Sequence, residues 1–106
     1  MPSYIVETYV PRAHSRDVDA ARCRARAAAE ILAGEGAEIR YVRSTHLPDD
    51  ETCFHVVEAA SHADVDELCR RADLGRVRIV AAVETWLELA GAASQDGATC
   101  PLEPSS

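Results

Sequence analysis

The chain has 106 residues, of which 47% are hydrophobic and only 5% aromatic, so we expect one domain with a small core. Its 18 acidic residues outnumber its 11 arginines, lysine is absent, and the net charge is −7. A negative chain is not attracted to phosphate backbones, which argues against nucleic-acid binding. No apolar run approaches the roughly 20 residues of a membrane span, which argues against a membrane protein.

Residues 4–10 predict a first strand, because polar and apolar side chains alternate there and Pro11, which lacks an amide hydrogen, ends the strand. A helix is expected to follow, capped by Ser15 or Asp17 and extending to about residue 33. Its apolar residues, mostly alanine, recur at helical spacing and form one buried stripe.

The middle of the chain predicts two strands, at residues 38–46 and 52–60, joined by a turn in which proline is followed by two aspartates. Ser61, with an acidic residue three positions later, predicts the start of a second helix. The buried stripe of this helix is expected to consist of Val65, Leu68, Cys69 and Ala72. Residues 76–86 alternate again and predict a fourth strand.

The order strand, helix, strand, strand, helix, strand predicts an α+β, ferredoxin-like βαββαβ fold with a four-stranded antiparallel sheet. Residues 1–90 form this domain, and residues 91–106 are expected to be a flexible C-terminal tail or an arm that orders on a partner. Two helices cover only one face of such a sheet. We therefore expect the other face to pair with a second copy, giving a homodimeric α+β barrel.

Alternation along the strands sorts their side chains onto the two faces of the sheet. The helix-facing side is expected to carry Tyr4, Val6, Ile39, Tyr41, Phe54, Val56, Val77 and Ile79. The opposite side is expected to carry Glu7, Tyr9, Arg40, Cys53, His55, Arg78 and Glu84.

The four cysteines, Cys23, Cys53, Cys69 and Cys100, are widely spaced and form no CxxC motif. Neither a zinc knuckle nor a thioredoxin-type redox pair is therefore indicated. The first residues lead directly into the predicted first strand, with no pattern typical of a signal peptide. We expect a cytoplasmic protein with reduced thiols.

The opening run MPSYIVETYVP and the central run RYVRSTHLPDDETCFHVVEA, with residues 71–74 and 78–84, resemble a family of small nickel-binding proteins. The resemblance covers roughly residues 2–84. It implies a ferredoxin-like fold, a homodimer and bound nickel. The chain departs from the family pattern at His55, where similar chains often have cysteine or an apolar residue, and a change of ligand there would change the metal preference.

Two clusters supply candidate metal ligands. On the expected bare face, His55 and Cys53 lie near Glu7 and Tyr9 of the neighbouring strand, and imidazole with carboxylate suits Ni(II) or Zn(II). At the turn, His46 is followed by three acidic residues, a donor set suited to a harder ion. Each cluster also has an interpretation without a metal. The first would be a polar dimer interface that satisfies His55, and the second would be an acidic turn in contact with solvent.

From these clusters and from what the resemblance implies, we predict nickel or another divalent cation as the bound ion. The predicted ligands are Glu7, His46, Glu51 and His55, with Tyr9, Asp49 and Cys53 as further candidates.

Two other classes of function stay open. A small-molecule binder or enzyme would use a cavity of the barrel around Tyr9, His55 and Arg78, with Glu7, Glu84 or His55 as acid–base groups. No spacing indicates a Ser-His-Asp or Cys-His nucleophile, so the sequence does not decide whether the protein is an enzyme. An interaction module would use the tail of residues 91–106 as its arm.

Overall fold

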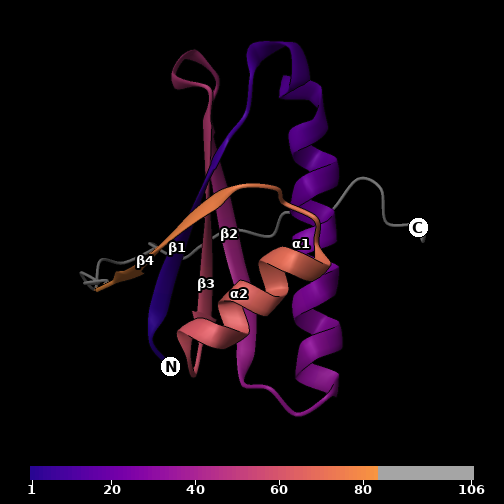
Figure 1. The fold of residues 1–106 in the computed structure, drawn as a ribbon, viewed down its shortest axis with the longest axis vertical. Coiled ribbons are helices and arrows are strands. Elements are labelled where there is room, and N and C mark those ends of the chain that lie inside the picture. The colour runs from indigo at the N-terminus through magenta and orange to yellow at the C-terminus, as the bar shows by residue number, and fades with distance from the viewer. Residues whose placement is uncertain (84–106) are drawn as a thin grey trace, which may run out of the picture.

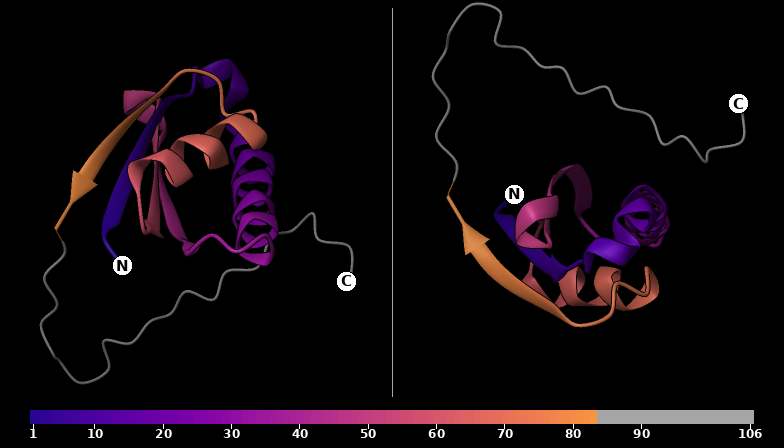
Figure 2. Two further views of the ribbon diagram at one scale, coloured as in Figure 1. Left: turned by 60° about the horizontal axis from the view of Figure 1, so that its bottom comes forward. Right: turned by 90° about the horizontal axis from the view of Figure 1, so that it is seen from above.

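The computed structural model describes residues 1–83. Its strands and helices are β1 (Ser3–Tyr9), α1 (Val18–Gly34), β2 (Ile39–Leu47), β3 (Thr52–Ala59), α2 (His62–Arg71) and β4 (Val77–Ala82), with short 3-10 helices η1 (Arg12–Asp17) and η2 (Pro48–Asp50). The strands form one antiparallel sheet in the order β2-β3-β1-β4. Both helices lie on one side of this sheet (Figures 1 and 2).

This α+β arrangement confirms the predicted element order and is compatible with a ferredoxin-like fold. The predicted end of the fourth strand, Glu84 and the tail of residues 91–106 lie outside the described residues. Neither helix in residues 1–83 is long and apolar enough to cross a membrane.

The two helices begin differently. The Ser61 hydroxyl accepts a hydrogen bond from the backbone N–H of Asp64 at 3.2 Å, which confirms the predicted cap of α2. Asp17 occupies the N-cap position of α1, one of the two predicted residues, but its side chain makes no capping hydrogen bond. The Asp17 carboxylate instead lies 3.3 Å from Nδ1 of His14 within η1.

The core lies between the sheet and the two helices. Alanine and Leu32 supply the buried stripe of α1, and Val65 and Leu68 are the large buried residues of α2. They pack with Val6 of β1 and Val57 of β3. The predicted helical stripes are therefore confirmed.

The predicted faces of β3 are wrong. Val6 pairs directly with His55, and Tyr4 pairs with Val57. Directly paired residues point to the same side of a sheet, so His55 and Val57 share the helix-facing side with Val6. Cys53 and His55 are each 1% exposed, and Phe54 and Val56 take the opposite side.

A β-bulge in β2 decides to which side of the sheet each side chain in the second half of the strand points. The register of β2 against β3 shifts between Tyr41 and Arg43, so Val42 is a bulge. Tyr41 stays on the helix-facing side, and the shift brings His46 opposite Cys53 on that same side.

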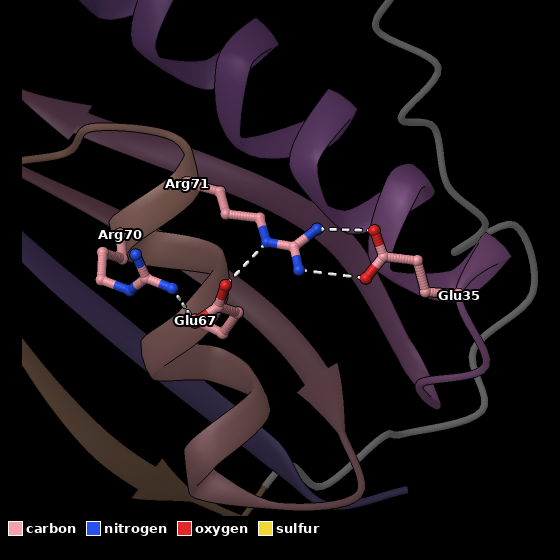
Figure 3. A network of polar contacts seen from close by, with 4 residues as sticks. All are labelled: Glu35, Glu67, Arg70 and Arg71. Atoms are coloured by element: carbon pink, nitrogen blue, oxygen red, sulfur yellow. Dashed lines mark hydrogen bonds and ion pairs between the residues drawn. The ribbon is translucent and has the colours of Figure 1, made fainter.

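Exposed ion pairs tie the C-terminal ends of the two helices together (Figure 3). The Arg71 guanidinium donates to both carboxylate oxygens of Glu35 at 2.9 and 3.0 Å, and it also pairs with Glu67. Glu67 accepts a second hydrogen bond from Arg70. The pairs are open to solvent, so they position the helix ends more than they stabilise the fold.

Replacement of Leu68 by alanine is expected to lower the free energy of unfolding by about 2–5 kcal/mol, because its side chain is fully buried and leaves a cavity. Leu47→Ala is the matched control, since Leu47 is 38% exposed and loses little burial. Urea unfolding followed by circular dichroism measures both. Equal losses in the two variants would contradict the assigned core.

Candidate functional site

The helix-facing side of β3 carries a contiguous polar group around His55. Sγ of Cys53 lies 3.8 Å from Nε2 of His55, and the Tyr41 hydroxyl oxygen lies 2.6 Å from Nδ1. Both nitrogens of this imidazole therefore have a polar neighbour. Strand alternation brings Cys53 and His55 to one side, and the β2–β3 pairing adds Tyr41.

A cavity of about 150 Å³ reaches this group from the surface. Its wall is largely apolar and includes Val10, Pro11, Val18, Ala21 and Leu74. His14 and Asp17, both exposed, lie at its outer side, whereas the buried Cys53 and His55 line its inner side. A small solute that enters the cavity from its exposed side therefore meets a thiol and an imidazole.

Burial sets the charge of these two groups. It lowers the pKa of His55 to about 4, with a further lowering by the positive charge of Arg22. Burial raises the pKa of the Cys53 thiol to about 11, which Arg22 partly opposes. At neutral pH the pair is an uncharged thiol beside an uncharged imidazole. It is not the thiolate–imidazolium pair of a cysteine nucleophile.

His46 contributes an unsatisfied atom. Nε2 of its ring is buried and has no hydrogen-bond partner among the described residues. Buried polar atoms normally find a partner, so this nitrogen carries a local cost in stability unless a further group binds it. Its register opposite Cys53 puts it on the same side of the sheet as the Cys53–His55 pair.

The four predicted ligands are not brought together. His46 and His55 share the helix-facing side, whereas Glu7 lies on the opposite side and pairs with Arg78 at 3.1 Å. Cys53, a further candidate, lies beside His55.

Glu51 ties the end of β1 to the β2–β3 turn. Its carboxylate accepts hydrogen bonds from the Tyr9 hydroxyl at 3.2 Å and from the Arg12 backbone N–H at 2.9 Å. The bond from Tyr9 raises the pKa of that phenol. The backbone of Glu51 is left-handed, with a φ of 52°. Asp49 is fully exposed and lies 3.8 Å from Arg12.

Within residues 1–83, no group of three or more His, Cys, Asp or Glu side chains is arranged to hold a metal ion. The Cys53–His55 pair thus offers two donor atoms, and His46 lies opposite Cys53 on the neighbouring strand. Sequence reasoning missed the hydroxyl of Tyr41 as a partner of His55. A buried tyrosine hydroxyl needs a partner, which is a signal that was present in the sequence.

Comparison of the chain with protein-family models, with curated proteins and with solved structures gave no match. The resemblance to nickel-binding proteins therefore stays a prediction.

The stability of the metal-free protein is expected to fall as the pH drops from 7 to 4.5. The unfolded chain takes up a proton on His55 near pH 6.5, but the folded state does so only near pH 4. The unfolded state therefore binds more protons in this window, and the contribution lost is on the order of 3 kcal/mol.

Urea unfolding in the presence of a chelator at pH 7 and 4.5 measures this effect. His55→Gln is expected to flatten the pH dependence, whereas His62→Gln, which changes an exposed ring, is expected to retain it. An unchanged slope in His55→Gln would contradict a buried neutral His55.

Proposed function

We propose that this protein binds a transition-metal ion at the inner side of the cavity, through Cys53 and His55 with His46 as a third donor. The observation that carries the proposal is the 3.8 Å separation of the Cys53 and His55 donor atoms. Bonds of about 2.3 Å to sulfur and 2.0–2.1 Å to nitrogen separate two ligands of a tetrahedral ion by about 3.6 Å. The two side chains thus need only a small adjustment to share one ion.

The surroundings of His55 support the same role. A ligating imidazole commonly donates its other N–H to a fixed acceptor, which sets its tautomer. The Tyr41 oxygen lies 2.6 Å from Nδ1 and can accept its hydrogen; in that tautomer the lone pair of Nε2 is directed at Cys53. An ion bound there would also give the unpartnered Nε2 of His46 a ligand role.

We propose further that the protein is a homodimer through the bare face, the side of the sheet opposite α1 and α2. Ile5 of this face pairs with Val56 and Val80, which gives it an apolar centre. Four of its charged side chains are paired within the chain, Glu7 with Arg78 and Arg40 with Glu58. Paired charges lower the cost of covering such a face with a second copy.

Titration of the tag-free protein with Ni(II) and Zn(II) is expected to show one ion per chain, lost in Cys53→Ser and His55→Gln. The matched control is Cys69→Ser, because Cys69 is also buried and its thiol pKa is also raised to about 11, but it lies outside the cavity. Isothermal calorimetry and elemental analysis give affinity and stoichiometry. Full uptake by both site variants would contradict the assignment.

A second candidate function is binding of a small organic molecule, favoured by the largely apolar wall of the cavity. Thermal stabilisation by such a compound, unchanged by chelator and lost on Ala21→Phe, would support it in place of metal binding.

Val80→Arg is expected to shift the dimer to monomer, because it adds an unpaired charge to the apolar part of the bare face beside Ile5, where Val80 is 36% exposed. Ile31→Arg is the control, since Ile31 is 57% exposed on α1, away from the sheet. Sedimentation equilibrium gives the mass of each variant. A monomeric unsubstituted chain, or an unchanged dimer in Val80→Arg, would contradict this interface.

A further inference from the structure

We infer that the ion held by Cys53 and His55 is Cu(I), bound at low coordination number inside the cavity. This inference rests on the proposed metal-binding function and names the ion that the donor set, the charges and the burial of the site favour. The sequence resemblance points instead to nickel, so the two ions make different predictions for the same residues.

The number of donors favours Cu(I). Residues 1–83 hold no group of three or more His, Cys, Asp or Glu arranged around one ion, and the close pair of donors at the buried inner side of the cavity is Cys53 with His55. Ni(II) and Zn(II) normally take four or more ligands, whereas Cu(I) is stable with two or three. If the His46 imidazole also binds the ion, the number of ligands rises to three, and the added donor is again an imidazole nitrogen.

The kind of donor favours Cu(I) as well. Thiolate and imidazole are soft or borderline ligands, and thiolate sulfur selects soft ions such as Cu(I). The carboxylates predicted to complete a divalent site lie elsewhere, Glu7 on the bare face and Glu51 in hydrogen bonds to β1 and η1. Asp17, the carboxylate among the described residues that line the cavity, is exposed and faces His14.

The charge of the buried site points the same way. Binding of Cu(I) displaces the thiol proton to solvent, and the resulting thiolate–Cu(I) unit is neutral. A divalent ion with the same thiolate leaves a net positive charge among residues that are 1% exposed. Arg22, which pairs with Asp19 at 3.3 Å, lowers the pKa of both side chains, so its charge also disfavours additional positive charge at the site.

The experiment is an anaerobic Cu(I) titration against a chromophoric Cu(I) chelator, with parallel Ni(II) and Zn(II) titrations. The protein is the full chain carrying Cys23→Ser and Cys100→Ser, which removes two other thiols that would compete for Cu(I). Cys53→Ser and His55→Gln are tested in this background, with Cys69→Ser as control. X-ray absorption of the Cu(I)-loaded protein reports the ligands directly and does not depend on the folding of any site variant.

The expected result is one Cu(I) per chain with two or three ligands, one of them sulfur, and affinity for Ni(II) and Zn(II) lower by about 100-fold or more. Loss in both site variants but not in Cys69→Ser assigns the site. Stoichiometric Ni(II) or Zn(II) bound there as tightly as Cu(I), or a four-coordinate Cu(I) spectrum, overturns the Cu(I) inference while the metal-binding function stands. Uptake of all three ions that is absent or insensitive to both site variants overturns the metal-binding function itself.

Discussion

The pairing of β1 with β3 is the constraint on which the rest of the structure depends. Side chains alternate along a strand, so a slip of one residue would turn Cys53 and His55 outward and bring Phe54 and Val56 into the core. The observed register puts His55 opposite Val6. A side-chain hydrogen bond between the two strands supports this register: the Thr8 hydroxyl donates to the Cys53 carbonyl oxygen at 3.2 Å.

Glu51 extends the same constraint beyond the sheet. Its backbone carbonyl accepts a hydrogen bond from Val10 at 2.7 Å, and its carboxylate holds Tyr9 and Arg12. The chain therefore leaves β1 toward η1 along a fixed path, and η1 forms part of the cavity wall above Cys53 and His55. Glu51, which the sequence suggests as a metal ligand, thus connects the β2–β3 turn to β1 and η1.

The two faces of the sheet separate two properties of the molecule. The polar group around His55 lies under the helices, where burial keeps both thiol and imidazole uncharged. The bare face carries apolar residues and internally paired charges, which suit contact with a second copy. Because β3 contributes to both faces, the proposed metal binding and the proposed dimerisation can be tested independently by substitutions on alternate residues of one strand.

The sequence by itself determined the elements and their order. Helical spacing predicted the stripes of α1 and α2, Ser61 predicted the start of α2, and the proline and aspartates after Leu47 predicted the β2–β3 turn. These signals are local, since each depends on residues within a few positions of one another.

Only the tertiary structure decided which side of β3 faces the helices. This strand lies inside the sheet, and Val56 and Val57 are both buried, at 6% and 0% exposed, so its alternation in polarity does not distinguish the two faces. The bulge at Val42 likewise has no local signal, yet it sets the side on which His46 lies. Pairing between strands brings together Tyr41, Cys53 and His55. This pairing forms cooperatively over the whole sheet, so no single position in the sequence determines it.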